Sequence, residues 1–139
     1  MSMNDPISPA VKGDFPVIGL KDSLRSAIEK MSENNTSALI VKHEQEVVGI
    51  VTDMDLMRGI VSYDDFDEPT AASFMTPCEL ITEKPTTSPC VQLHEGETVR
   101  NALEVMDAAG VHNLLVACEV GSGTCMVSIR DLLKLAIKE

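Results

Sequence analysis

The stretch that decides the fold is Asp22-Ser-Leu-Arg-Ser-Ala-Ile-Glu-Lys-Met31, because it returns 75 residues later as Glu97-Thr-Val-Arg-Asn-Ala-Leu-Glu-Val-Met106. The two stretches match in chemical type at nearly every position, which is how a tandem duplication shows itself in a sequence. The chain therefore carries two copies of one structural unit. Outside the stretch, the correspondence continues through two further pairs of apolar segments: Leu39-Ile-Val41 with Leu114-Leu-Val116, and Ile50-Val-Thr52 with Met126-Val-Ser128.

The first copy combines helical and strand patterns. Apolar residues recur at helical spacing from Leu24 to Met31, and Ser23 with Asp22 supplies an amino-terminal cap. Residues 38–41 and 47–51 are short apolar strands, and the polar residues between them predict a hairpin. A second helix follows. We expect it to bury four apolar side chains: Leu56, Met57, Ile60 and Val61.

The second copy repeats these elements in the same order. Apolar residues from Val99 to Met106 indicate a helix that Gly110 can end. Strands are expected near residues 113–117 and 125–127. The last helix should bury another four apolar side chains: Ile129, Leu132, Leu133 and Ile137.

A unit of this size exposes an apolar sheet face that is too small to be stable alone, so we expect two α+β units packed with pseudo-twofold symmetry. Such a pairing creates two equivalent clefts at the strand-to-helix turns, where small ligands bind. The acidic segment 63–68 and the Pro- and Thr-rich segment 83–89 indicate exposed connections, with a boundary near residue 70. We assign residues 1–14 to an N-terminal extension, 15–70 to the first repeat, and 71–139 to the linker and second repeat.

Both copies carry a hydroxyl residue followed three residues later by an aspartate. The sequences are Thr52-Asp-Met-Asp55, called here the first junction, and Ser128-Ile-Arg-Asp131, the second junction. Either tetrapeptide alone is most simply a helix cap, with the carboxylate complementing the helix dipole. The same geometry also suits a sugar phosphate, because helix-start amides bind anions and a carboxylate can accept both hydroxyls of a ribose.

The segments Val48–Leu56, Phe74–Pro77 and Met126–Leu133 resemble the CBS domain, which usually occurs as a tandem pair called a Bateman module. The likeness covers roughly residues 15–137. It implies a strand, helix, strand, strand and helix in each half, and modules that often pair into homodimers. It also implies an adenosine ligand such as AMP, ADP, ATP or S-adenosylmethionine, bound as a regulatory ligand with no cofactor required.

The resemblance assigns roles at both junctions. Asp55 and Asp131 would hold ribose hydroxyls, Thr52 and Ser128 would approach phosphate, and Met75 and Thr76 belong to the family linker and not to the chemistry. Backbone near the start of a strand in each copy would border the base, at Ala38 and Leu39 and at Asn113 and Leu114. Arg58, one turn after the first motif, could reach a ligand phosphate, although an exposed arginine on a helix is usually only solvated. Arg130, at the second junction, is also a candidate for contacting phosphate.

Two departures from the family pattern distinguish the junctions. Cys125 stands where the first copy has the expected Gly49, so a side chain can intrude on the second cleft. Asp53 adds a negative charge where phosphate would sit in the first copy, whereas the second copy has Arg130. Charge therefore favours phosphate at the second junction and a neutral or cationic adenosine compound at the first, while Cys125 argues against that ranking.

Composition excludes several classes of function. A formal net charge of −11 and an aromatic content of 3% disfavour binding to nucleic acid or to anionic membranes. No apolar run can span a bilayer and no signal pattern is present, so we expect a cytoplasmic protein. The cysteines and histidines lack metal-ligand spacing, and Cys118 and Cys125 are interpreted as buried reduced thiols and not as a disulfide.

No catalytic motif is present, which favours a protein that is not an enzyme. The main hypothesis is a ligand-sensing module that acts through a homodimer or through a separate effector protein. The alternative is a scaffold or dimerisation module with degenerate, empty clefts. A weaker third hypothesis, an enzyme acting on a nucleotide, predicts turnover of the ligand and not only binding.

Overall fold

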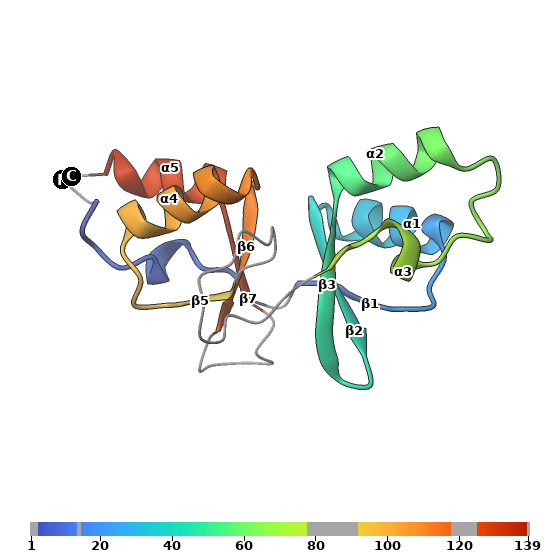
Figure 1. The fold of residues 1–139 in the computed structure, drawn as a ribbon. Coiled ribbons are helices and arrows are strands. Elements are labelled where there is room, and N and C mark those ends of the chain that lie inside the picture. Colours follow the sequence, from blue (N-terminus) through green and yellow to red (C-terminus); the bar gives the residue numbers. More distant parts are fainter. Residues whose placement is uncertain (1–2, 14, 78–91, 118–124, 139) are drawn as a thin grey trace. The chain divides into compact units, whose positions relative to one another are not determined.

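The computed structural model describes residues 3–13, 15–77, 92–117 and 125–138. The predicted connection at 83–89 lies outside these residues. The chain folds into two compact units, the first comprising Phe15–Cys78 and the second comprising Met1–Asp14 together with Glu79–Glu139 (Figure 1). Each unit holds one small sheet with its helices on one side, so the expected α+β class is confirmed.

The first unit contains a four-stranded sheet in the order β1-β2-β3-β4. Strand β1 runs parallel to β2, and the other two pairs are antiparallel. Helices α1 and α2 occupy the expected places before and after the β2–β3 hairpin. The elements are β1 (Val17–Gly19), α1 (Leu24–Asn34), β2 (Ala38–His43), β3 (Glu46–Thr52), α2 (Asp53–Ser62), α3 (Ala71–Phe74) and β4 (Thr76–Pro77).

The second unit contains a three-stranded sheet in the order β5-β6-β7, again with one parallel and one antiparallel pair. The series of strand, helix, strand, strand and helix therefore occurs in both units, as the resemblance implied. The elements are the 3-10 helix η1 (Ser8–Ala10), β5 (Gln92–His94), α4 (Val99–Ala109), β6 (Asn113–Ala117), β7 (Cys125–Ser128) and α5 (Ile129–Ala136).

Local sequence signals explain where the first helix of each unit begins and ends. The Ser23 hydroxyl accepts a hydrogen bond from the Ser26 amide at 3.1 Å, which caps α1 as predicted. Thr98 caps α4 in the same way. Gly110 ends α4 with a φ of 69°, a left-handed conformation that glycine adopts without steric cost, and this also agrees with the prediction.

Each unit has its own apolar core, built from aliphatic side chains with almost no aromatic contribution. In the first unit, α1 and α2 pack on the sheet through Leu24, Ala27 and Leu56, and α3 adds Ala71 and Phe74. The core of the second unit combines side chains of its sheet and helices with two from the N-terminal segment: Ile7, Ala10, Leu93, Val99, Ala102, Met106, Leu114, Val116, Cys125, Val127 and Leu132.

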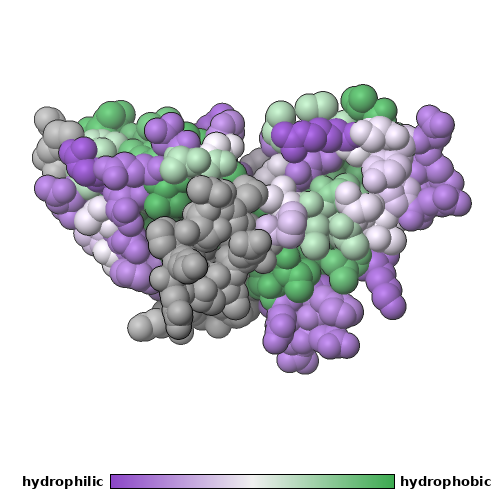
Figure 2. Space-filling model, viewed as in Figure 1, coloured by the Kyte–Doolittle hydropathy of each residue, from purple (hydrophilic) through white to green (hydrophobic). Residues whose placement is uncertain are grey.

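The second helix of each unit buries fewer apolar side chains than the sequence predicted. Leu56 and Leu132 are buried, but Met57, Ile60, Val61, Leu133 and Ile137 are exposed, Val61 to 78% and Ile137 to 82%. The prediction of burial was wrong for these five side chains. Helical periodicity identifies the apolar side of a helix but does not say how wide a strip the sheet covers. Apolar surface over α2 and α5 is visible in Figure 2.

Residues 5–13, before β1, pack on the second unit in the same way as residues 69–77, after α2, pack on the first. The Ile7 amide donates to the Glu97 carbonyl at 2.8 Å, and the Ala71 amide donates to the Asp22 carbonyl at the same distance. Further along, Lys12 forms an antiparallel bridge with Met126. Each bridge has an equivalent in the first unit. The bridge between Pro6 and Thr98 corresponds to that between Thr70 and Ser23. The bridge between Lys12 and Met126 corresponds to the pairing of Thr76 with Ile50.

Cys125 is disulfide-bonded. The expectation of a reduced thiol at this position was therefore wrong; it rested on the assumption of a reducing cytosol, in which disulfides are rare. Cys118 lies outside the described residues. In the described part of the chain, no helix is both long enough and apolar enough to cross a membrane.

Candidate functional site at the strand-to-helix junctions

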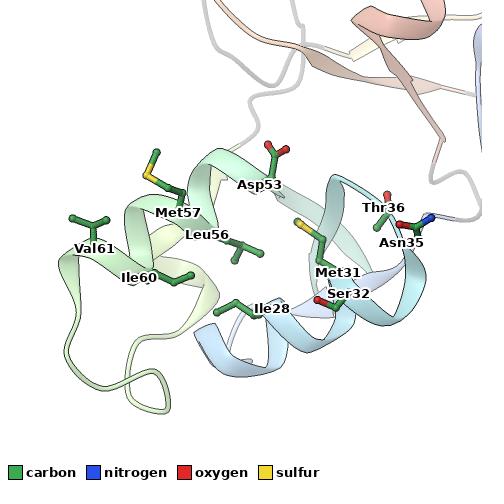
Figure 3. Close-up of a pocket in the computed structure, with 10 residues that line it drawn as sticks. All are labelled: Ile28, Met31, Ser32, Asn35, Thr36, Asp53, Leu56, Met57, Ile60 and Val61. Atoms are coloured by element: carbon green, nitrogen blue, oxygen red, sulfur yellow. The ribbon is translucent and has the colours of Figure 1, made fainter.

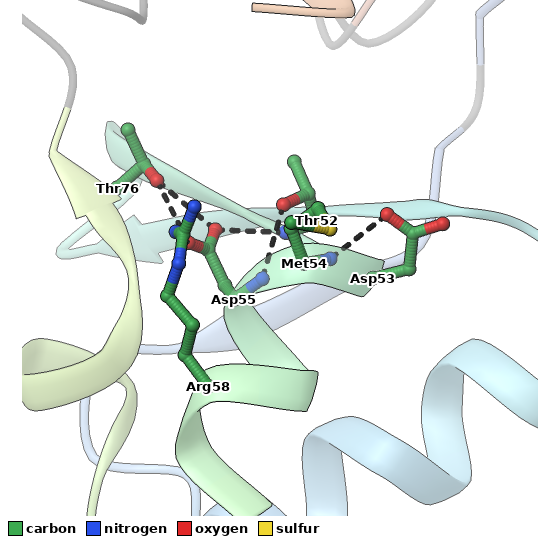
Figure 4. Close-up of polar contacts among 6 residues, drawn as sticks. All are labelled: Thr52, Asp53, Met54, Asp55, Arg58 and Thr76. Atoms are coloured by element: carbon green, nitrogen blue, oxygen red, sulfur yellow. Dashed lines mark hydrogen bonds and ion pairs between the residues drawn. The ribbon is translucent and has the colours of Figure 1, made fainter. Parts of the chain in front are cut away.

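At the first junction, Thr52 and Asp55 cap helix α2 reciprocally (Figure 4). The Asp55 amide donates to the Thr52 hydroxyl at 3.3 Å, and the Thr52 amide donates to Asp55 Oδ2 at 3.0 Å. This is the capping box that the tetrapeptide alone predicts. It holds the carboxylate at the end of β3, where the strand turns into the helix.

Asp55 has two further partners, and one of them comes from a distant segment. The Thr76 hydroxyl on β4 lies 3.1 Å from Asp55 Oδ1 and 3.0 Å from Oδ2. Arg58, one turn further along α2, places Nη1 3.4 Å from Oδ1. Asp55 is only 5% exposed, so both of its carboxylate oxygens are engaged inside the protein. Thr76, which the sequence analysis assigned to the linker alone, is thus part of the junction.

Asp53 occupies the amides at the start of α2 with its own side chain. Its Oδ1 accepts a hydrogen bond from the Met54 amide at 2.8 Å, and its own amide donates to the Ser37 carbonyl at 3.1 Å. With the Asp55 amide bonded to Thr52, the first three amides of α2 all have partners. The Asp53 carboxylate therefore occupies the position at the helix start where an external anion could otherwise bind.

The second junction has a different set of bonds. The Asp131 amide donates to the Ser128 hydroxyl at 3.2 Å, and that hydroxyl donates to Asp131 Oδ2 at 3.0 Å. Lys12 Nζ lies 3.2 Å from the same oxygen. Among the described residues, no donor bonds Asp131 Oδ1. The Asp131 side chain is 18% exposed, so this carboxylate is more accessible than that of Asp55.

The helix start at the second junction also differs from that of the first. The Ile129 amide donates to the His112 carbonyl at 2.8 Å, and the Asp131 amide is taken by Ser128. The Arg130 amide between them has no bonded acceptor in the described part of the chain. Ile129 occupies the position of Asp53 at the first junction, and its apolar side chain cannot accept a hydrogen bond from the Arg130 amide. The Arg130 side chain is exposed beside this amide.

The remaining predicted residues lie beside the hydroxyl residues in the sheets. Ala38 pairs with Thr52 across the β2–β3 ladder, and Asn113 pairs with Ser128 across β6–β7. The register of each hairpin therefore places the backbone expected to border a base next to the hydroxyl expected to approach phosphate. The side chains of Leu39 and Leu114 belong to the two cores.

A hollow of about 310 Å³ in the first unit is bordered by Asp55, Arg58, Ser73 and Thr76. It brings together two of the predicted site residues and the threonine that the prediction missed. Thr52, Ala38 and Leu39 do not line it. The described residues contain no cluster of His, Cys, Asp and Glu that could hold a metal ion.

A second hollow, of about 440 Å³, lies between α1 and α2 (Figure 3). Ile28 and Met31 of α1 face Leu56 and Ile60 of α2 across it, and Asp53 lies at its rim. Its lining is mainly apolar, so it is chemically unlike the polar hollow beside Asp55.

Comparison with solved structures supports the same architecture. A conserved, uncharacterised protein from Pyrococcus horikoshii is 21% identical, with a TM-score of 0.77 over 100% of this chain and 97% of that chain. The CBS domain pair of protein MJ0100, solved with 5′-methylthioadenosine and S-adenosyl-L-methionine, is 16% identical, with a TM-score of 0.72 over 94% of each chain. The CBS domain of a bacterial CNNM/CorC family Mg²⁺ transporter, solved with ATP, is 19% identical, with a TM-score of 0.73 over 99% of this chain and 90% of that chain.

At these identities the structural likeness concerns the fold alone. No curated protein matches the sequence. The CBS domain family model, however, matches residues 7–65 and again residues 79–138, which together make up most of the chain. The repeat, the fold and this double match lead to one conclusion: the chain belongs to the CBS domain family and carries two copies of the domain.

Proposed function

We propose that the chain is a regulatory module that binds an adenosine derivative, such as AMP, ADP, ATP or S-adenosylmethionine, at its strand-to-helix junctions. The observation that carries the proposal is the repeated placement of a hydroxyl and a carboxylate at the start of a helix. Thr52 with Asp55 and Ser128 with Asp131 are held together by hydrogen bonds at the ends of β3 and β7. Neither carboxylate is turned out into bulk water.

The chemistry of the second junction fits a ribose phosphate. Asp131 Oδ1 is available to accept a hydrogen bond from a ribose hydroxyl. The Arg130 amide and the Ser128 hydroxyl lie at a helix start, where the dipole and unpaired amides favour an anion. The backbone of Asn113, adjacent to Ser128 in the sheet, is available to border a base.

The two junctions differ in the ligand they favour. At the first, Asp53 already occupies a helix-start amide with a negative charge, which opposes a ligand phosphate. A neutral or cationic adenosine compound suits that junction better. At the second, Arg130 replaces this negative charge with a positive one, so we assign phosphorylated ligands to it.

Two relatives with this fold support the class of ligand. The MJ0100 domain pair was solved with 5′-methylthioadenosine and S-adenosyl-L-methionine, and the transporter domain was solved with ATP. All three compounds contain adenosine, while only one carries phosphate. The same fold therefore accommodates both phosphorylated and unphosphorylated adenosine compounds. This agrees with our assignment of different ligands to the two junctions of this chain.

The proposed output is a change in the populations of module arrangements that a homodimer or an effector protein detects. Exposed apolar side chains on α2 and α5, including Met57, Ile60 and Leu133, support a partner on these helices. In this proposal the ligand is bound and released unchanged. We place the module in the cytoplasm, where nucleotides of this class are available, although a disulfide such as that of Cys125 is uncommon in this compartment.

The alternative function is a scaffold whose clefts stay empty, and two observations favour it. Both oxygens of Asp55 are bonded inside the protein, so a ribose must displace Thr76 or Arg58 to reach them. The disulfide-bonded Cys125, in place of the glycine found in the first copy, favours the same alternative at the second junction.

Thermal unfolding with AMP, ATP, S-adenosylmethionine and NAD tests the proposal. A ligand at a hundred times its dissociation constant adds roughly 2.7 kcal/mol to the free energy of unfolding, which raises the Tm by several degrees. We expect such a rise with at least one adenosine compound. Chromatography of that compound after incubation with the protein should show that it is not converted. Unchanged Tm values with all four would favour the scaffold, and conversion would favour an enzyme.

A further inference from the structure

We propose that Lys12, on the N-terminal segment, determines the ligand specificity of the second junction by selecting phosphorylated over unphosphorylated adenosine compounds. The inference rests on the proposed function and adds a residue to it. Lys12 lies in the part of the sequence that was set apart as an extension, and neither the repeat nor the family resemblance pointed to it. Its ammonium group lies 3.2 Å from Asp131 Oδ2.

The position of Lys12 is set by the fold and not by its side chain. The Lys12 amide donates to the Met126 carbonyl at 2.9 Å, and the Met126 amide donates to the Lys12 carbonyl at 2.9 Å. Ile7 and Ala10, earlier in the segment, are buried in the core of the second unit. Replacing the lysine side chain therefore removes a charge from the junction while the backbone that carries it stays in place.

Thr76 holds the equivalent place in the first unit. It pairs with Ile50 on β3 as Lys12 pairs with Met126 on β7, and its hydroxyl contacts Asp55 as the Lys12 ammonium contacts Asp131. The fold thus brings a residue from outside each repeat onto the junction aspartate. It is a neutral hydroxyl in one unit and a cation in the other.

The bond between Lys12 and Asp131 is easily exchanged. The Lys12 side chain is 65% exposed, and ion pairs of this kind contribute little to stability because water and salt screen them. A ribose that donates one hydroxyl to Asp131 Oδ1 and the other to Oδ2 competes with Lys12 for Oδ2. A long, flexible lysine can then turn to a phosphate held at the adjacent helix start, where the Arg130 amide has no bonded acceptor among the described residues.

This exchange distinguishes ligands by charge. A phosphorylated ligand recovers the lost ion pair through its own phosphate, so Lys12 favours its binding. An unphosphorylated adenosine breaks the same ion pair and gains nothing in return. Lys12 therefore raises affinity for one class of ligand and lowers it for the other, which a residue with a purely structural role does not do.

The test is calorimetric titration of the full chain with AMP and with adenosine, for the parent, Lys12→Thr and Lys12→Arg. Lys12→Thr installs the side-chain type found at Thr76, and Lys12→Arg keeps the charge. Lys134→Thr is the matched control, because it removes the same charge from the last turn of α5. Thermal unfolding without ligand verifies that all variants keep the parent's fold.

We expect Lys12→Thr to weaken AMP binding by about tenfold, the size of one charge-assisted contact, and to leave adenosine binding equal or tighter. Lys12→Arg and Lys134→Thr should retain the parent's ratio of the two affinities. The proposal is wrong if Lys12→Thr changes both affinities alike or changes neither. If the parent binds neither compound nor any other adenosine derivative, the proposed function fails and the role of Lys12 fails with it.

Discussion

The Thr76 hydroxyl lies 3.1 Å and 3.0 Å from the two carboxylate oxygens of Asp55, although the residues are 21 positions apart in the chain. The contact links β4 to the start of α2. Because the Thr76 hydroxyl already donates to the Asp55 carboxylate, a ligand at the first junction must compete with it. The Asp55 carboxylate therefore stabilises the fold and is also a candidate to bind a ligand.

Replacing Thr76 with valine should destabilise the first unit. Thr76→Val keeps the shape of the side chain but removes a donor from a buried carboxylate, and such a loss costs about 1–3 kcal/mol. Urea unfolding followed by circular dichroism measures the change. Ser73→Ala is the matched control: it removes an exposed hydroxyl of the same segment, whose hydrogen-bond partner in the described part of the chain is the Thr70 carbonyl. Equal stabilities of the two variants would show that the Thr76 contact is energetically unimportant.

Gly49 should tolerate no side chain, because β4 approaches it closely. A Cβ at this position would lie 2.7 Å from Met75 Sδ and 2.8 Å from the Thr76 carbonyl oxygen. Overpacking of this kind costs about 1–3 kcal/mol, so Gly49→Ala should lower the Tm. At Gly13 the nearest atom to an added Cβ is Cys125 Sγ at 3.5 Å, an ordinary contact. Gly13→Ala should leave the Tm nearly unchanged, and an equal loss in both variants would argue against this explanation.

Ile7 should matter for stability although it precedes the first repeat. Its side chain is fully buried in the core of the second unit, and truncation of such a side chain costs about 2–5 kcal/mol. Ile7→Ala should therefore lower the midpoint of urea unfolding clearly, whereas Ser8→Ala, at an exposed neighbouring position, should not. A small effect of Ile7→Ala would mean that the N-terminal segment is not part of the second unit's core in solution.

Much of the fold was predictable because the duplication repeats its local signals. Ser23 and Gly110 mark helix ends through capping preferences that depend on neighbouring residues only. The aspartates at positions 55 and 131 were visible for the same reason. Each follows a hydroxyl by three residues, and a helix start brings such a pair together whatever the rest of the chain does.

The features that sequence analysis missed all depend on contacts between distant segments. Residues 5–13 and 69–77 occupy equivalent places, but they share only an apolar pattern and no identical residue, so comparing the sequence with itself did not pair them. The roles of Lys12 and Thr76 follow from that pairing. Likewise, the exposure of Val61 and Ile137 depends on what covers each helix, which periodicity does not encode.

The central claim is that the two junction aspartates bind the ribose of an adenosine ligand. Calorimetric titration of Asp55→Asn, Asp131→Asn and the double variant tests it most directly, because asparagine keeps the shape of the side chain and removes its charge and one acceptor. For the compound that stabilises the parent most, we predict that one single variant weakens binding at least about tenfold, the effect of losing a charge-assisted bond, and that the double variant shows no binding. A double variant that binds the compound with the parent's affinity and stoichiometry would contradict the claim.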